Sequence, residues 1–138
     1  MRKNLNLSGN KFWILGLGFF LLDVCLQFVF RLKNLGIPNY GISFGAFDGE
    51  GKWLGIVIFA LYVGWMVFDK SLPRRLSLPL VIIFFGGLGN ILSRVFAGSV
   101  WDYIYLPSLP FWFNLSDCLI TVGVVSYILG SNGDSSSI

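Results

Sequence analysis

The sequence predicts an all-α membrane protein, in which four transmembrane helices carry a small β-like extramembrane element after the first helix. Composition is the first observation, because 55% of the 138 residues are hydrophobic and 12% are charged, with a mean hydropathy of +0.74. Soluble domains average about 25% charged residues. The second observation is that the apolar residues form four continuous runs, each near the ~20 residues that cross ~30 Å of hydrocarbon.

The four runs define the expected domain organisation. Because they are continuous rather than alternating, a β-barrel is disfavoured. At this length the chain is expected to be one integral membrane domain, residues 1–138. The approximate spans are 12–30, 53–68, 76–94 and 111–129.

The first run follows the basic residues Arg2, Lys3 and Lys11, a charged start that a signal peptide would share. The run is long and lacks a small-x-small cleavage site, so a first spanning helix is favoured. Asp23 and Gln27 lie four residues apart in it and share one face. We expect both to point into the bundle, Asp23 with a structural rather than a catalytic role.

Residues 31–52 are rich in glycine and have short alternating apolar residues, which predicts a small hairpin-like element outside the membrane. Asn39 and Gly41 lie at its turn. A turn asparagine is most often a local cap, and this is the first interpretation of Asn39.

Basic residues set the expected orientation. Six of the ten are at the amino terminus or in the loop between the second and third runs, and four are on the other side. By the positive-inside rule, both termini and that loop are expected in the cytoplasm. The six are Arg2, Lys3, Lys11, Lys70, Arg74 and Arg75, and the four are Arg31, Lys33, Lys52 and Arg94.

Polar side chains interrupt the second half of the chain near the expected outer surface. Asn90 and Arg94 lie one turn apart in the third run, and Asn114 and Asp117 lie three apart in the fourth. Asp102 lies between the two runs in an aromatic segment typical of the membrane interface. Charges in a bilayer cost about 2.5 to 3.5 kcal/mol on insertion scales, so such residues usually serve a function. Gly86, Gly87 and Gly89 are interpreted as ordinary small-residue packing.

The absence of histidine excludes Ser-His-Asp and Cys-His nucleophile systems and most zinc sites. Two aspartates that share a site hold one proton between them and so provide an acid and a base. On the residues alone, Asp102 and Asp117 are open to three interpretations, namely a protease dyad, structural ion pairing, and a proton or ion pathway. No metal site and no nucleic-acid signature is found.

Three sequence blocks together resemble the lipoprotein signal peptidase, or signal peptidase II, family. They are NYGISFG at 39–45, GGLGNILSRVFAGSVWDY at 86–103 and FNLSD at 113–117. The resemblance implies four helices with inward termini, in a multi-pass protein of the bacterial inner membrane with its site toward the outer face. It implies removal of the signal peptide from diacylglyceryl-modified prolipoproteins, cut before the lipidated cysteine, without cofactor.

The resemblance also implies roles for individual residues. Asp102 and Asp117 would be the catalytic pair, lined by Asn90, Arg94 and Asn114. The expected partners are the prolipoprotein, membrane lipids and a globomycin-type inhibitor, and a monomer is expected. Asn39 and Gly41 would contact substrate, and Asp23 would match the first-helix aspartate.

Two departures from the family keep alternatives open. The family usually has Asp-Arg where this chain has Ser93 and Arg94, and its first-helix block reads differently after Asp23. A missing carboxylate would leave Arg94 freer. The alternatives are an inactive homologue that binds lipidated precursors and a small proton- or ion-conducting membrane protein.

Overall fold

The computed structural model describes residues 7–42, 49–69 and 77–132, which form four helices and four short strands. The helices are α1 (Leu7–Leu32), α2 (Gly51–Phe68), α3 (Ser77–Ala97) and α4 (Leu115–Asn132). The strands are β1 (Ile37–Asn39), β2 (Val100–Asp102), β3 (Ile104–Tyr105) and β4 (Trp112–Phe113).

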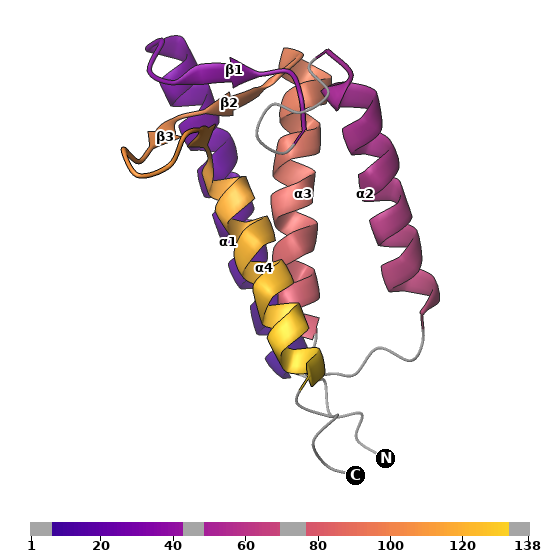
Figure 1. Cartoon of the computed structure of the whole chain (residues 1–138). Coiled ribbons are helices and arrows are strands. Elements are labelled where there is room, and N and C mark those ends of the chain that lie inside the picture. Colours follow the sequence, from indigo (N-terminus) through magenta and orange to yellow (C-terminus); the bar gives the residue numbers. More distant parts are fainter. Residues whose placement is uncertain (1–6, 43–48, 70–76, 133–138) are drawn as a thin grey trace, which may run out of the picture.

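Helix α3 is the centre of the bundle. It packs on α4, α1 and α2, and α4 also contacts α1. The strands lie together at one end of the bundle, and the first turn of α1 and the last turn of α4 both lie at the other end (Figure 1). The described ends of the chain therefore lie at the same end of the bundle.

Three helices are long and apolar enough to cross a membrane, at Lys11–Leu32, Gly51–Phe68 and Leu78–Ala97. Within α4 the apolar stretch Leu115–Ser131 is shorter. Large apolar side chains point away from the bundle; Leu61 is 69% and Phe68 is 82% exposed. Outward apolar faces suit helices surrounded by lipid, and the predicted fold class is confirmed.

The β element is built from distant parts of the chain. β1 pairs antiparallel with β2, with Ile37 opposite Asp102, and β3 pairs antiparallel with β4. The predicted small β element is therefore present, but β1 finds its partner in β2 rather than in a local hairpin; residues 43–48 lie outside the described part. The fourth helix begins at Leu115, later than residue 111, because Trp112–Phe113 is a strand.

Close packing of α4 on α3 depends on glycine. A Cβ on Gly86 would lie 2.7 Å from the carbonyl oxygen of Ser116, and one on Gly89 would meet the Ser116 hydroxyl. Small residues allow helix backbones to approach in a membrane, as the sequence suggested. This approach brings the first turn of α4 against the half of α3 that lies nearer the strands.

The best-buried side chains of the described residues are mostly polar. Asp23 and Asn114 are fully buried and Asp102 is 2% exposed. Burying such groups is costly unless they are hydrogen-bonded. The interior at the strand end is thus a polar cluster, in a protein whose apolar surface faces outward.

Candidate active site

Asp102 is held at the end of β2 by two side-chain amides. Asn39, at the end of the paired strand β1, donates from Nδ2 to Oδ2 at 2.9 Å. Asn114 donates from Nδ2 to Oδ1 at 2.8 Å. Both carboxyl oxygens of Asp102 are therefore fixed by residues that the sequence placed at the candidate site.

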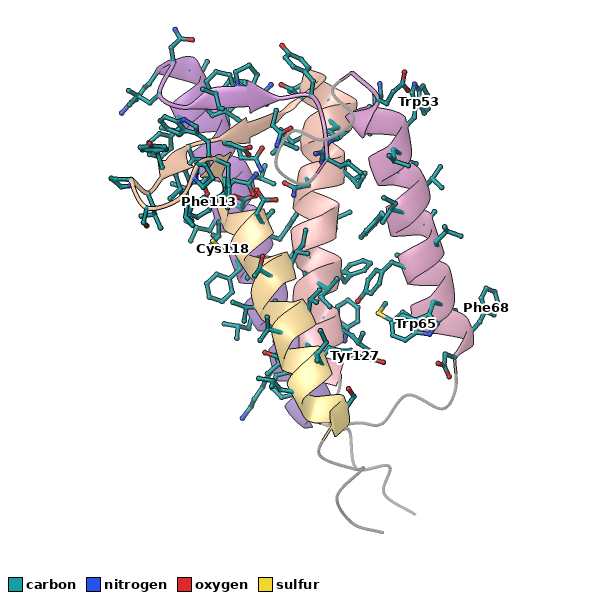
Figure 2. The ribbon with its side chains drawn as sticks, viewed as in Figure 1. Trp53, Trp65, Phe68, Phe113, Cys118 and Tyr127 are labelled. Atoms are coloured by element: carbon teal, nitrogen blue, oxygen red, sulfur yellow. The ribbon has the colours of Figure 1, made fainter. Side chains whose placement is uncertain are left out.

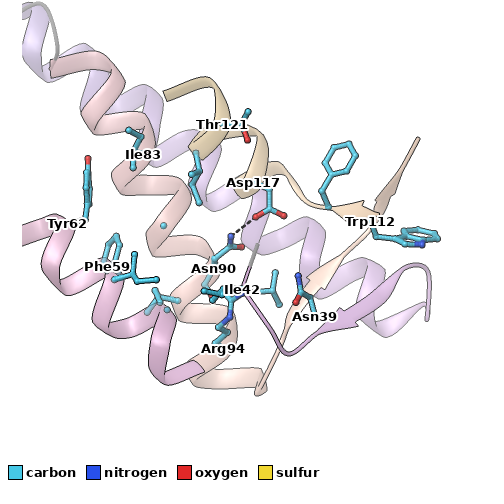
Figure 3. Close-up of a pocket in the computed structure, with 17 residues that line it drawn as sticks. Asn39, Ile42, Phe59, Tyr62, Ile83, Asn90, Arg94, Trp112, Asp117 and Thr121 are labelled. Atoms are coloured by element: carbon cyan, nitrogen blue, oxygen red, sulfur yellow. Dashed lines mark hydrogen bonds between the residues drawn. The ribbon is translucent and has the colours of Figure 1, made fainter. Parts of the chain in front are cut away.

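Asp117 is fixed by the start of α4. Asn114 precedes the first residue of the helix, and its Oδ1 accepts a hydrogen bond from the Asp117 backbone N–H at 3.0 Å. In return, the Asn114 backbone N–H donates to Asp117 Oδ2 at 3.2 Å. This reciprocal pattern is a capping box, with Asn and Asp in place of the usual Ser and Glu. The other oxygen, Asp117 Oδ1, accepts from Asn90 Nδ2 at 2.8 Å (Figure 3).

Asn114 connects the two aspartates. Its backbone and side-chain oxygen engage Asp117, while its side-chain amide engages Asp102. The same amide donates to Asn90 Oδ1 at 3.3 Å, which links the pair to α3. The structure thus joins Asn39, Asp102, Asn114, Asp117 and Asn90 in one hydrogen-bonded network.

The Asp102 carboxyl has a perturbed proton affinity. Burial raises the pKa of Asp102 above its usual value. The amide donors Asn39 and Asn114 and the cation of Arg94 oppose this rise, whereas the negative charge of Asp23 adds to it. A buried carboxyl with a raised pKa beside a second carboxyl is suited to hold or release a proton.

Arg94 is buried beside this network and ties α3 to the segment after β1. Its Nη2 donates to the carbonyl oxygen of Gly41 at 2.6 Å, and its Nη1 donates to that of Asn90 at 3.3 Å. Among the described residues its Nε has no partner. Gly41 in turn donates its N–H to Asn39 Oδ1 at 3.0 Å, so the local turn interpretation of Asn39 holds together with its contact to Asp102.

Asp23 forms a second cluster next to the first. It accepts hydrogen bonds from Gln27 at 2.7 Å, from the Tyr103 hydroxyl at 2.8 Å and from Ser116 at 2.5 Å. Burial and Asp23 raise the pKa of Tyr103, so this hydroxyl keeps its proton as a donor. These contacts tie α1 to the strand segment and to α4, which supports the structural role expected of Asp23. Sequence reasoning missed Tyr103 and Ser116, since neither stands out by residue type or spacing.

A cavity of about 330 Å³ opens beside the network, between α2, α3 and α4 (Figure 3). Its polar end is formed by Asn39, Asn90, Arg94 and Asp117. Asp102 does not line it and reaches this end through Asn39 and Asn114. The described residues contain no group of three or more His, Cys, Asp or Glu side chains that could hold a metal ion.

The hydrogen bonds of Ser93 lead to Arg31 and to the Ser99 carbonyl oxygen, not to Arg94. The Ser93 hydroxyl donates to the carbonyl oxygen of Ser99 at 3.0 Å and accepts from Arg31 Nη2 at 3.4 Å. Arg31 also donates to the carbonyl oxygens of Ala97 and Ser99, and its guanidinium lies 5.4 Å from the Trp101 ring centre. Ser93 and Arg94 have different partners because consecutive residues of a helix point in different directions.

Comparison with known proteins gives one family. A family model described as signal peptidase (SPase) II matches residues 9–132. A lipoprotein signal peptidase of Methylorubrum extorquens (strain PA1) is 32% identical over 136 residues, which cover 90% of this chain and 77% of the relative. One of Methylobacterium radiotolerans is 34% identical over 127 residues, covering 82% of this chain and 73% of the relative.

Two solved structures, each described as a bacterial membrane enzyme, share the fold. The first has a TM-score of 0.76 at 20% identity and covers 96% of this chain and 92% of the other. The second has a TM-score of 0.66 at 20% identity, with coverage of 91% and 93%. At this identity the likeness concerns the fold alone.

Proposed function

The chain belongs to the signal peptidase II family, and from this premise we propose that it is an aspartic endopeptidase of the bacterial inner membrane. Its substrate is a diacylglyceryl-modified prolipoprotein, cut just before the lipidated cysteine. The observation that carries the proposal is the Asn114 bridge, which holds Asp102 and Asp117 in one network at the polar end of an apolar cavity.

In the proposed mechanism the two carboxyl groups share one proton. The ionised member takes a proton from a water molecule, whose oxygen attacks the carbonyl carbon of the scissile peptide bond. The protonated member donates a hydrogen bond to the carbonyl oxygen and so stabilises the charge that develops there. When the C–N bond breaks, a proton passes from the pair to the leaving amine.

The remaining site residues position this pair. Asn39, Asn90 and Asn114 supply amide donors that fix three of the four carboxyl oxygens, and the backbone of Asn114 fixes the last. Arg94 keeps a buried Nε–H free of partners among the described residues, beside the place where the substrate backbone would lie. Preorganised donors of this kind save reorganisation during the reaction.

The dyad predicts non-additive losses. Asp102→Asn and Asp117→Asn keep side-chain shape but cannot share the proton, and residues that act as a unit are grossly non-additive. Each variant should abolish cleavage of a purified diacylglyceryl prolipoprotein, and the double variant should be no worse than either single one. A globomycin-type peptide should inhibit the wild type, and substrate binding should survive better than turnover.

Two outcomes would contradict the proposal in different ways. Substantial cleavage by well-folded Asp102→Asn or Asp117→Asn protein would refute the dyad. No cleavage by the wild type across several lipidated precursors, with the inhibitor still bound, would identify an inactive homologue that binds the same substrates.

A further inference from the structure

The cavity continues away from the dyad as an apolar channel between α2, α3 and α4. Phe59 and Tyr62 of α2, Ile83 of α3 and Thr121 of α4 line it (Figure 3). Ile83 is seven residues before Asn90, so at ~1.5 Å per residue the channel extends about 10 Å along α3 from the polar end. It therefore leads from the interface toward the middle of the bundle.

The channel also opens sideways. α2 and α4 both pack on α3, and at the end far from the strands Trp65 of α2 meets Tyr127 of α4, with ring centres 5.9 Å apart (Figure 2). Between this contact and the dyad, Ile58 and Thr121 line the channel and are also exposed at the surface of the bundle. A group can therefore pass from surrounding hydrocarbon into the channel between α2 and α4.

The contacts between α2 and α3 leave no room for a helix between them. A Cβ on Gly87 of α3 would lie 2.7 Å from the Phe59 ring of α2, and the Tyr62 hydroxyl of α2 donates to the Leu80 carbonyl oxygen of α3. A helix with its side chains is about 10 Å across. The helical part of a signal peptide is therefore expected to stay outside the channel, which leaves an extended peptide or a hydrocarbon chain as its occupant.

The polarity of the channel disfavours an extended peptide. Backbone N–H and C=O groups without partners are costly in a low-dielectric environment. Below Asn90 the polar groups of the wall are the hydroxyls of Tyr62 and Thr121, and Tyr62 already donates to the Leu80 carbonyl oxygen at 2.6 Å. A hydrocarbon chain leaves no polar group unsatisfied there.

Building on the proposed function, we propose that this channel receives one acyl chain of the diacylglyceryl group of the substrate. The acyl chain passes from the lipid hydrocarbon into the channel between α2 and α4. The glyceryl group stays at the polar end beside Asn90 and Asp117. The peptide then keeps to the polar surface near Asn39 and Gly41, where backbone partners are present. The channel thus fixes the lipidated cysteine next to the dyad.

The test narrows the channel and varies the acyl chain. Thr121→Trp adds bulk at the exposed rim, and Val122→Trp adds the same bulk on the next residue, which is 55% exposed and does not line the channel. Two synthetic lipopeptides, one with palmitoyl and one with octanoyl chains, are cleaved in bilayer nanodiscs. The ratio of the palmitoyl KM to the octanoyl KM should rise about tenfold in Thr121→Trp, the scale on which an apolar pocket discriminates, and stay at the wild-type value in Val122→Trp.

If the ratio of the palmitoyl KM to the octanoyl KM is unchanged in folded Thr121→Trp, the inference is overturned, because the acyl chain would then bind elsewhere. A second measurement decides independently of that variant. A palmitoyl chain with a diazirine at its middle should label peptides containing Phe59 or Ile120 in Asp117→Asn protein, which binds without turnover; labelling confined to α1 would overturn the inference. Absence of cleavage of both lipopeptides by the wild type refutes the proposed function instead, and the labelling still tests the channel.

Discussion

At the scale of a single residue, Asn114 has two structural roles that depend on different atoms. Its side-chain oxygen and backbone N–H cap α4 with Asp117, and its side-chain amide holds Asp102 and Asn90. The first duty concerns folding and the second concerns the geometry of the candidate site. Because different atoms perform them, substitution can separate them.

Asn114→Ser and Asn114→Ala are predicted to differ in stability but not in activity. Serine is as good an N-cap as asparagine, whereas alanine in that place costs about 1 kcal/mol. Neither supplies the amide that holds Asp102. Both should lose turnover about 10- to 100-fold, because a hydrogen bond to a charged group is worth about 1.5 to 3 kcal/mol. Thermal unfolding in detergent and cleavage assays measure the two effects. Near-wild-type turnover in Asn114→Ser would show that the bridge has no catalytic importance.

A pH-dependent stability follows from Asp102. Its raised pKa means that the folded state binds this proton more tightly than the unfolded chain does. The group therefore contributes stability that is fully present below about pH 4, the usual pKa of aspartate, and is lost as pH rises through the raised pKa. The melting-temperature difference between the wild type and Asp102→Asn should shift in favour of the wild type as pH is lowered from neutral. A shift in the opposite direction would show that the carboxyl is stabilised in its ionised form.

Individual residues show where sequence reasoning reaches its limit. Asn39, Asn90, Asp102, Asn114 and Asp117 could be selected because each is polar in an apolar or aromatic setting. Which of them line the cavity and which lie behind could not be predicted, because this depends on which strands pair. Asp102 lies behind Asn39 only because β1 is set against β2.

At the scale of elements, Arg31 fastens the end of α1 to the end of α3. It donates to the carbonyl oxygens of Ala97 and Ser99, where the helix dipole favours a cation. Gln27 adds a bond from the Trp101 backbone N–H to its own Oε1 at 3.2 Å. α1 therefore fixes the segment between α3 and β2, and this in turn positions Asp102 at the end of β2.

Ser93→Asp is predicted to be tolerated and slightly stabilising, through Arg31 rather than Arg94. A carboxylate at this position would face the half-buried guanidinium of Arg31, and such a pair is worth about 0 to 1 kcal/mol. Thermal unfolding of the single variants and of Ser93→Asp with Arg31→Leu forms a double-mutant cycle. If Ser93→Asp changes the thermal stability equally with and without Arg31, then Arg31 does not interact with the introduced carboxylate.

Spans and strands differ in how far sequence predicts them. The helices carry long local signals, and their observed bounds lie near the predicted runs. The strands have two or three residues each, too few for alternation to be seen, and β1 joins a partner more than sixty residues away. The β element was thus predicted from glycine content and short alternation, whereas β2, β3 and β4 were not.

At the scale of the whole molecule, polarity is distributed along the bundle axis. The buried polar network and the strands occupy one end, and the first turn of α1 and the last turn of α4 occupy the other (Figure 1). In the sequence, six of the ten basic residues precede the first apolar run or lie between the second and third runs. We therefore propose that the strand end faces outward and the terminal end faces the cytoplasm.

Site-directed labelling tests this orientation in intact cells. In a background without Cys25 and Cys118, a cysteine at Ser108 should react with an impermeant maleimide added outside, because Ser108 is exposed beyond β3 at the strand end. A cysteine at Ser136 should react only after the membrane is opened, since it follows α4 on the proposed cytoplasmic side. Reaction of Ser136→Cys alone from outside would invert the orientation and place the dyad at the cytoplasmic face. Reaction of both cysteines from outside would mean that α4 does not span the membrane. This outcome matters because the apolar stretch of α4 is shorter than those of the other three helices.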